Sequence, residues 1–299
     1  MYVLLVDISG KMKPTLISLF SGCGGSSLGY KMADYKELLA IDFDKNSIET
    51  FKLNFSEIPC WNKDITKISS NEILDFCNLK IDELDVLDGS PPCQGFSSAG
   101  KRKVNDNRND LFKEYIRFVK ELRPKVFLME NVSGMTKGKM KGKYIEIMTS
   151  LKDLDYNVKS AILNSKYYGV PQSRERLIFI GIRKDLNKQV SFPQSNEKII
   201  NVSDVIPNAI KMNREQFDRM WKDTNRPSYT ITKRVGLKFQ FKDGNIRRAN
   251  ISELKILSSF PQDFKFIGSF GEQWARIGNA VMPKFMYHLA KHIKETILV

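Results

Sequence analysis

The sequence predicts an α/β protein with a mostly parallel sheet covered by helices on both faces. Short apolar runs alternate with helical patterns along the first half of the chain, and glycine-rich or polar turns follow several of these runs. The chain has 299 residues, enough for one large domain or for a large and a small one.

The predicted strands are short apolar runs, and the predicted helices have apolar residues at helical spacing. The strands cover residues 15–20, 38–41, 86–88, 126–129 and 177–182. The helices cover residues 26–32, 45–54, 111–122 and 144–151. The helix over 111–122 should end at Arg123, because Pro124 follows and proline disfavours a helical conformation in the residue before it.

After Asp185 this alternation fades. Residues 183–248 contain 15 Lys and Arg against 7 Asp and Glu, so +8 of the net charge of +14 lies there. We expect a small, irregular, basic domain over 186–271 and a larger domain formed by 1–185 and 272–299. The sequence GNAV at 278–281 and the helix expected after Pro283 return to the larger domain.

The charge balance favours a polyanionic partner. The pI is near 9.5, which places nucleic acid ahead of an anionic membrane or an acidic protein. A soluble protein with a lysine-rich surface remains the plainer alternative. No apolar run has membrane-spanning length, and Met1–Lys13 lacks the layout of a cleavable signal, so we expect a cytoplasmic protein with free thiols.

We do not expect a metal site. The four cysteines show neither a CxxC pair nor zinc-finger spacing. His288 and His292 lie four residues apart, a spacing that metal ligands use on a helix, but no acidic or sulfur side chain flanks them in register. A solvated helix face explains this pair better.

A glycine-rich loop follows the first predicted strand and opens the first predicted helix. Its residues are Phe20, Ser21, Gly22, Cys23, Gly24 and Gly25. Glycine lets a backbone approach a ligand closely, and the amides at a helix N-terminus favour negative charge. The loop alone is a weak signal, because a plain tight turn has the same composition.

Later residues strengthen the ligand interpretation. Asp42 ends the second strand, where a carboxylate can accept hydrogen bonds from ribose hydroxyls. Phe43 could stack on an adenine, and Asp64 with Ile65, near the third strand position, could contact its amino group. Each residue alone is more often a strand-end acid or a core aromatic. Together, in this order, they predict an adenosine-binding site.

A rigid cysteine-containing turn follows the strand over 86–88. Residues 89–94 have the sequence GSPPCQ, and the two prolines aim the Cys93 thiol at the end of the sheet. A free cysteine is usually a small buried hydrophobic residue, but that role predicts an apolar setting and not this turn. Cys93 is therefore a candidate nucleophile, whereas we expect the thiols of Cys23, Cys60 and Cys77 to be structural.

Two charged motifs accompany the two following strands. Glu130 and Asn131 close the strand over 126–129, where a partly desolvated carboxylate can act as a proton donor. Residues 172–176 (QSRER) precede the strand over 177–182, and Arg174 and Arg176 could pair with Glu130, a substrate carbonyl or phosphates. On its own, the sequence RER is most often a surface charge run.

The motifs FSGCGG, IDFD, GSPPCQGFS, MENV, QSRERL and GNAVMP occur in this order from Thr15 to the C-terminus. In this order they resemble the bacterial and phage-type DNA (cytosine-5-)-methyltransferase family. The resemblance implies a Rossmann-like domain that binds S-adenosylmethionine and a small target-recognition domain over 186–271. It further implies methylation of carbon 5 of a flipped cytosine in double-stranded DNA, within a restriction-modification or phage and host DNA-modification system.

The resemblance also implies catalytic roles. Cys93 is similar to the nucleophile that adds to cytosine carbon 6, and Glu130 to the acid that binds ring nitrogen 3. Arg176 is similar to the residue that holds the base oxygen. Arg174 would support Glu130 and the target base, and Asn131 would brace the turn that carries Cys93.

The resemblance implies two binding sets as well. The residues similar to the family's cofactor contacts are Phe20, Asp42, Phe43, Asp64, Ile65, Pro92, Leu111, Asn279 and Val281. Residues 97–108, with Ser97, Lys101, Arg102 and Arg108, resemble the loop that closes over DNA. In the basic segment we expect Arg226, Thr230, Thr232 and Arg234 to lie at the DNA surface.

Three alternatives remain open. An RNA-directed member of the same family would share these motifs, although the basic segment favours DNA. A non-catalytic DNA-binding relative would be expected to lack the thiol or the acid, and both are present. A nicotinamide-dependent dehydrogenase has no need of a Pro-Pro-Cys turn, and FSGCGG lacks the GxGxxG spacing. We expect a monomer, with any cognate restriction endonuclease acting separately.

Overall fold

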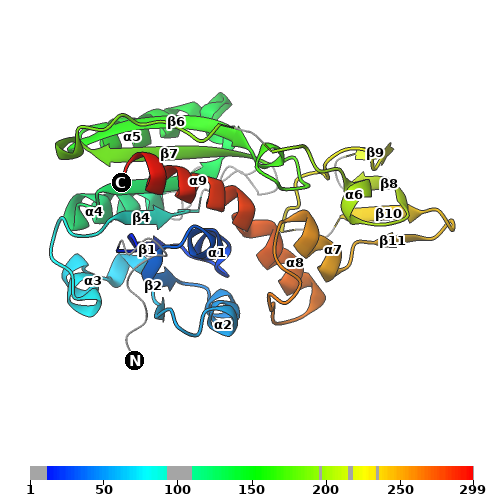
Figure 1. Ribbon diagram of the computed structural model, residues 1–299, viewed down its shortest axis with the longest axis horizontal. Helices are drawn as coiled ribbons and strands as arrows, with labels where there is room; N and C mark the ends of the chain where they lie inside the picture. Colours follow the sequence, from blue (N-terminus) through cyan, green and yellow to red (C-terminus); the bar gives the residue numbers. More distant parts are fainter. Residues whose placement is uncertain (1–11, 93–109, 195–196, 215–217, 234–235, 299) are drawn as a thin grey trace.

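The structure is a computed structural model that describes residues 12–92, 110–194, 197–214, 218–233 and 236–298. It contains a larger and a smaller sheet (Figure 1). The larger sheet contains β1 (Thr15–Leu19), β2 (Lys36–Asp42), β3 (Cys60–Asn62), β4 (Val86–Gly89), β5 (Val126–Val132), β6 (Tyr156–Asn164) and β7 (Glu175–Arg183). The smaller contains β8 (Ala209–Arg214), β9 (Asp218–Asp223), β10 (Leu237–Phe241) and β11 (Ile246–Arg248).

Helices separate and follow these strands. The α-helices are α1 (Gly25–Met32), α2 (Lys45–Asn54), α3 (Ser70–Cys77), α4 (Leu111–Leu122), α5 (Lys141–Lys152), α6 (Val202–Val205), α7 (Ile251–Leu257), α8 (Phe270–Asn279) and α9 (Pro283–Thr296). Short 3-10 helices are η1 (Ile65–Lys67), η4 (Ser133–Thr136), η5 (Gly138–Met140), η6 (Ser165–Tyr167) and η7 (Lys184–Leu186). The predicted helices over 45–54 and 111–122 agree with α2 and α4 at both ends.

The larger sheet is mostly parallel, as the alternation of elements predicted. Its order is β3-β2-β1-β4-β5-β7-β6, and the strands from β3 to β5 run parallel. The two remaining strands differ, because β7 pairs antiparallel with both β5 and β6. A link of about ten residues joins β6 to β7, which suits antiparallel neighbours because a parallel crossover needs a dozen residues or more.

The two faces of the larger sheet are covered by different helices. Alternate strand residues point to opposite faces. Ile17, Leu87 and Phe127 pack in one cluster with residues of α3, α4 and α5. The neighbouring residues of the same strands, including Leu16 and Val86, pack in a second cluster with residues of α1 and α9. This three-layer arrangement is visible in Figure 1.

The smaller sheet is more regular than the sequence led us to expect. Its order is β11-β10-β8-β9, and every pairing is antiparallel. Leu237 and Phe239 alternate with polar residues along β10, so a short strand with one buried face gave no continuous apolar run. The buried face packs on α7 through Leu254 and Leu257, in a cluster that also contains Phe51 of α2.

The strand order fixes where a ligand site can form. Along the sheet, β1 is followed by β2 on one side and by β4 on the other, so the chain reverses its direction of travel between β1 and β4. Loops that leave the carboxyl ends of these strands diverge and open a crevice. The glycine-rich loop follows β1, and the Pro-Pro turn follows β4. Among the described residues, no helix is long and apolar enough to cross a membrane.

Candidate active site

The glycine-rich loop connects β1 to α1 through left-handed backbone conformations. Phe20 and Gly22 both have φ of 57°, and Gly24, which precedes α1, has φ of 92°. A Cβ atom added to Gly22 would meet nothing within 4 Å, whereas one added to Gly25 would lie 2.2 Å from the carbonyl oxygen of Val281. The loop is therefore open on the side of Gly22 and closed against residues 280–281 on the side of Gly25.

Asp42 lies at the end of β2 and is tied to this loop. Its carboxylate accepts hydrogen bonds from the backbone N–H of Gly22 and of Asp44, both at 2.8 Å. Burial raises the pKa of Asp42, and these two hydrogen bonds oppose that rise. The acid is thus oriented by backbone donors and keeps lone pairs with which to accept from a ligand hydroxyl.

Phe43 is an unusually exposed aromatic residue beside that acid. Its exposed fraction is 76%. The Asn62 side-chain amide donates to the carbonyl oxygens of Asp42 at 3.1 Å and of Phe43 at 2.8 Å, so the turn that presents the ring is fixed. An exposed ring on a fixed turn suits stacking with a planar ligand.

Asp64 and Ile65 follow β3 at the same edge of the sheet. The Asp64 carboxylate accepts from the Thr66 N–H at 3.1 Å and from its hydroxyl at 2.8 Å, and these bonds lower the pKa of Asp64. Ile65 is buried. Leu111, at the start of α4, is half-buried and packs against the same core cluster.

These residues fit an adenosyl cofactor. The Ser21 hydroxyl is buried and has no hydrogen-bond partner among the described residues, which indicates a place for a polar ligand group. Asp42 offers acceptors, Phe43 offers an aromatic face, and Gly22 leaves room beside the backbone.

Cys23 is a residue of the glycine-rich loop. Its side chain is buried, and its sulfur lies 3.9 Å from the carbonyl oxygen of Arg276. Burial raises the pKa of the Cys23 thiol to about 12, so the thiol is neutral. Asn279, at the end of α8, is exposed, and Val281 is buried beside the loop.

The turn after β4 is held in place by its neighbours. A Cβ atom added to Gly89 would lie 2.5 Å from the Tyr115 ring, so only glycine fits there. The Tyr115 hydroxyl donates to the carbonyl oxygens of Leu87 and Leu128, at 3.0 and 2.9 Å. The Asn131 amide donates to the Pro91 carbonyl oxygen at 3.2 Å. Pro92 is half-buried, and Cys93, the next residue, lies outside the described residues.

Glu130 and Arg176 form a nearly buried ion pair beside this turn. The Arg176 Nε lies 2.6 Å from the Glu130 carboxylate, and the two side chains are 13% and 11% exposed. They come from neighbouring strands, β5 and β7, in which Val132 pairs with Arg176. Burial lowers the pKa of Arg176, and the Glu130 carboxylate opposes that effect. The structure thus brings together an acid and a base-binding candidate that the sequence separates by 46 positions.

Arg174 has different partners from those expected. Its guanidinium donates to the carbonyl oxygens of Ile231 at 2.6 Å, Gly278 at 2.8 Å and Ala280 at 3.3 Å. Backbone carbonyls, rather than the Glu130 carboxylate, therefore receive its hydrogen bonds, and the Glu130 carboxylate acts on it electrostatically. The expected support of Glu130 and of the target base stays a prediction. Burial lowers the pKa of Arg174 well below its ordinary value.

The residues expected to contact DNA fall into two groups. Ser97, Lys101, Arg102, Arg108 and Arg234 lie outside the described residues. In the other group, Arg226 is exposed. The Thr230 hydroxyl donates to the Ser173 carbonyl oxygen at 2.8 Å, and the Thr232 carbonyl oxygen accepts from the Trp274 indole N–H at 2.9 Å. Thr230 thus lies beside the QSRER motif and Thr232 beside α8, and neither lies on a strand of the smaller sheet.

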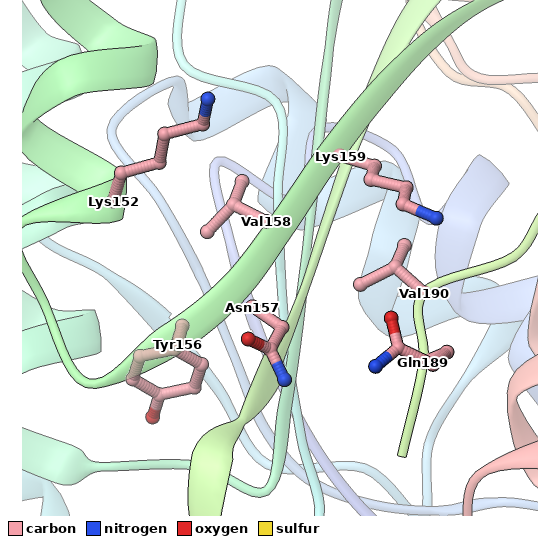
Figure 2. A pocket seen from close by; sticks show the side chains of 7 residues that line it. All are labelled: Lys152, Tyr156, Asn157, Val158, Lys159, Gln189 and Val190. Carbon is pink, nitrogen blue, oxygen red and sulfur yellow. The ribbon is translucent and has the colours of Figure 1, made fainter. Parts of the chain in front are cut away.

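A surface hollow of about 290 Å³ lies elsewhere (Figure 2). It is lined by Lys152, Tyr156, Asn157, Val158, Lys159, Gln189 and Val190. Tyr156 pairs with Arg183, whose neighbour Ile182 pairs with Val126 at the amino end of β5. Glu130 lies toward the other end of β5, so this hollow is separate from the candidate active site.

The two histidines of α9 have separate partners. His288 lies 3.6 Å from the Glu197 carboxylate, and His292 lies 2.9 Å from the Ser191 hydroxyl. Within the described ranges, no three His, Cys, Asp or Glu side chains gather in a metal-binding group.

The chain is similar in sequence to known proteins. The model of the C-5 cytosine-specific DNA methylase family matches residues 14–241 and 208–295. Type II methyltransferase M1.HphI of Haemophilus parahaemolyticus is 33% identical, and the match covers 96% of this chain and 87% of that protein. Type II methyltransferase M.NgoPII of Neisseria gonorrhoeae is 32% identical, with 94% and 96% covered.

The fold has solved counterparts. The crystal structure of a prophage-encoded E. coli protein is similar with a TM-score of 0.78 at 22% identity, over 96% of this chain and 100% of that one. The family match and the two relatives cover nearly the whole chain, including both sheets. The chain therefore belongs to the C-5 cytosine-specific DNA methylase family.

Proposed function

We propose that the protein is a DNA (cytosine-5-)-methyltransferase that transfers a methyl group from S-adenosylmethionine to carbon 5 of a flipped cytosine in duplex DNA, through a covalent intermediate on Cys93. The observation that carries the proposal is the nearly buried Glu130–Arg176 pair. It lies beside the Pro-Pro turn that leads to Cys93. The loop suited to an adenosyl group follows the adjacent strand, β1.

The cofactor would be held by the residues around the glycine-rich loop. Asp42 would accept from the ribose hydroxyls, and Phe43 would stack on the adenine. Ser21 would satisfy its buried hydroxyl on a polar group of the cofactor. When bound, the cofactor supplies an electrophilic methyl group.

The protein groups explain how an unreactive carbon becomes a nucleophile. The Cys93 thiolate would form a bond to cytosine carbon 6, and the electron pair displaced from the 5,6 double bond makes carbon 5 nucleophilic. Glu130, in its protonated form, would donate a proton or hydrogen bond to nitrogen 3, and Arg176 would bind the base oxygen, so the charge developing on the ring is stabilised. After carbon 5 gains the methyl group, it loses its proton to a base, and Cys93 leaves.

The target base must leave the DNA stack to reach these groups, so the enzyme should flip it. The polar face of the smaller sheet is a candidate DNA surface. Lys238 pairs with Arg248, and Gln240 pairs with Lys211, on the face opposite the buried Phe239. Lys and Arg at such a surface would bind phosphates with salt-dependent affinity.

We propose that the chain is divided into two domains with separate roles. Residues 1–185 and 272–299 would form the catalytic and cofactor-binding domain, and 186–271 the target-recognition domain, although α8 crosses the upper boundary. The names of the two relatives suggest a type II restriction-modification setting. The enzyme would act as a monomer, and a cognate endonuclease would act separately.

A methylation assay with two substrates tests the proposal. The purified protein should transfer labelled methyl groups from S-adenosylmethionine to unmethylated duplex DNA and not to a tRNA transcript. Bisulfite sequencing of the product should then show 5-methylcytosine in one short sequence. Label on adenine, or preferential labelling of the tRNA, would contradict the proposal.

A further inference from the structure

Residues 228–232 lie along residues 171–174 like a short strand pair. Ser228 donates its N–H to the Pro171 carbonyl oxygen at 3.0 Å and accepts from the Ser173 N–H at 2.9 Å. The Thr230 hydroxyl donates to the Ser173 carbonyl oxygen at 2.8 Å. The chain continues from this segment toward β10, so we name residues 228–232 the lead segment of the smaller sheet.

Gln172 holds the lead segment from a fully buried position. Its side-chain oxygen accepts from the Ile231 N–H at 3.0 Å. Its amide nitrogen donates to the Leu257 carbonyl oxygen at 3.1 Å and to the Ser258 hydroxyl at 3.2 Å. Its exposed fraction is 0%, so Gln172 cannot touch DNA. Any effect it has on DNA binding must therefore pass through the groups that it holds.

Arg174 holds the same residue from the other side. It donates to the Ile231 carbonyl oxygen, so both polar backbone groups of Ile231 are bound by side chains of one motif. Its other partners, the carbonyl oxygens of Gly278 and Ala280, lie at the C-terminal end of α8. The negative end of the helix dipole stabilises a cation there. The arginine thereby joins the lead segment to α8.

The spacing of the side chains in the QSRER motif, residues 172–176, explains these contacts. In extended backbone, alternate side chains share one face, so Gln172, Arg174 and Arg176 can point the same way. Arg176 binds Glu130, whereas Gln172 and Arg174 bind the lead segment and its neighbours. One run of five residues therefore contacts both the proposed catalytic acid and the segment that leads into the proposed DNA-reading sheet.

We infer that Gln172 and Arg174 are positioning residues that fix the lead segment relative to the Glu130–Arg176 pair. DNA held by the smaller sheet would then present its target base to Glu130. The inference rests on the proposed methyltransferase function. It assigns Arg174 to the placement of the DNA-reading part and not to direct binding of the base.

The first experiment uses Gln172→Met, which keeps the side-chain volume and removes its hydrogen bonds. Gln189→Met is the matched control, because Gln189 is exposed and lies at the separate hollow of Figure 2. Steady-state methylation would use a duplex that carries the target found by bisulfite sequencing. We expect Gln172→Met to raise KM for DNA at least tenfold and to change the cofactor Kd less than twofold, whereas Gln189→Met changes neither.

Arg174→Lys separates positioning from base binding. A lysine ammonium cannot span the three carbonyl oxygens, so KM for DNA should again rise at least tenfold. At saturating DNA, turnover should stay within about threefold of the wild type. A large loss of turnover at saturating DNA with unchanged KM would place Arg174 at the base and overturn the inference.

A milder pair of variants, both at Thr230, keeps the test informative if Gln172→Met does not fold. Thr230→Val removes one hydrogen bond of the lead segment, and Thr230→Ser keeps the hydroxyl. We expect a KM increase of a fewfold in Thr230→Val, recovered in Thr230→Ser, with unchanged melting temperatures. Unchanged KM values in the Gln172 and Thr230 variants of an active enzyme would overturn the inference. An inactive wild type would instead count against the proposed function.

Discussion

The candidate active site at the carboxyl ends of β1, β2, β4 and β5, where the strand order predicts a crevice, and the polar face of the smaller sheet are built differently. In the crevice, charged groups are fixed by neighbours: Glu130 by Arg176, and Asp42 by two backbone N–H groups. On the polar face of the smaller sheet, Lys211 and Arg248 are exposed to solvent. Chemistry on one base needs groups held in one geometry. Reading a DNA sequence needs side chains that can be replaced without disturbing the fold. We therefore expect the smaller sheet, and not the candidate active site, to tolerate replacement of its side chains.

An exchange of the smaller sheet gives the largest expected effect. Replacing residues 209–223 and 237–248 with the equivalent strands of a relative of known target should redirect methylation to the relative's site, because base contacts specify the sequence. Residues 228–232 should stay unchanged, since Gln172 and Arg174 hold them. Bisulfite sequencing reads the outcome. An active chimera that still modifies the original site would place specificity elsewhere.

Removing the Glu130 carboxyl group should nearly abolish turnover. Glu130→Gln eliminates the proton donor and leaves Arg176 unpaired, so we expect kcat to fall roughly 10²- to 10⁴-fold. The exposed Glu175→Gln on the next strand is the matched control. Cofactor binding by calorimetry checks the fold. A folded Glu130→Gln enzyme with wild-type kcat would remove Glu130 from the mechanism.

A smaller effect is expected at the cofactor loop. Asp42→Ala removes the acceptor of the Gly22 and Asp44 N–H groups as well as the proposed ribose contact. A lost hydrogen bond to a charged group costs about 1.5–3 kcal/mol, so the cofactor Kd should rise roughly 10- to 150-fold. The exposed Asp75→Ala on α3 should leave it unchanged. Calorimetry showing equal affinities would refute this placement of the cofactor.

The last expected effect is on stability and not on activity, and it concerns Glu37, a half-buried acid on β2. Burial, opposed by the hydrogen bond that the Ser27 hydroxyl donates at 3.0 Å, raises the pKa of Glu37 to about 7 from the 4.5 of an unburied glutamate. Between pH 4.5 and pH 7, Glu37 loses its proton in the unfolded chain but keeps it in the folded protein. This group therefore lowers the stability of the fold as pH rises from about 4.5 to 7, by roughly 3 kcal/mol.

Glu37→Gln should remove that dependence. Urea unfolding at pH 5 and pH 8 should show a stability gap between variant and wild type that widens toward pH 8, in favour of the variant. Glu49→Gln, at an exposed position on α2, is the control and should follow the wild type. Parallel profiles for Glu37→Gln and wild type would show that Glu37 is ionised in the folded protein.

The same contrast explains how much the sequence can predict. Asp42 and Glu130 lie at the ends of apolar strands, β2 and β5, so the pattern of residues is enough to assign both to the carboxyl edge of a parallel sheet. Arg176 begins β7, and its place at the same edge depends on the antiparallel pairing of β7 with β5. The helix α4 is equally predictable, because its buried residues recur at helical spacing. The Asn131 amide contacts the Pro91 carbonyl oxygen in the turn that we expect Asn131 to brace.

Other features depend on contacts between distant segments. Strand β6 has half-buried residues at the edge of the sheet and no continuous apolar run. The partners of Arg174 lie 57 and more positions away, and nothing local distinguishes it from Arg176. Gln172 escapes prediction because a glutamine carries no sign of burial, although its place in the QSRER motif is a usable signal. In the smaller sheet, apolar and polar residues alternate along β10, and this short pattern does not reveal that β10 pairs antiparallel with β8.

Covalent trapping tests the central claim most directly. With cofactor present, a duplex that carries 5-fluorocytosine at the target position should form a denaturation-resistant adduct with the wild type, because fluorine cannot leave carbon 5 as a proton does. Cys93→Ser should bind the cofactor with unchanged affinity yet form no adduct and show no turnover, since a serine alkoxide is much harder to generate than a thiolate. An adduct or robust methylation by Cys93→Ser, or an active wild type that is never trapped, would contradict the account.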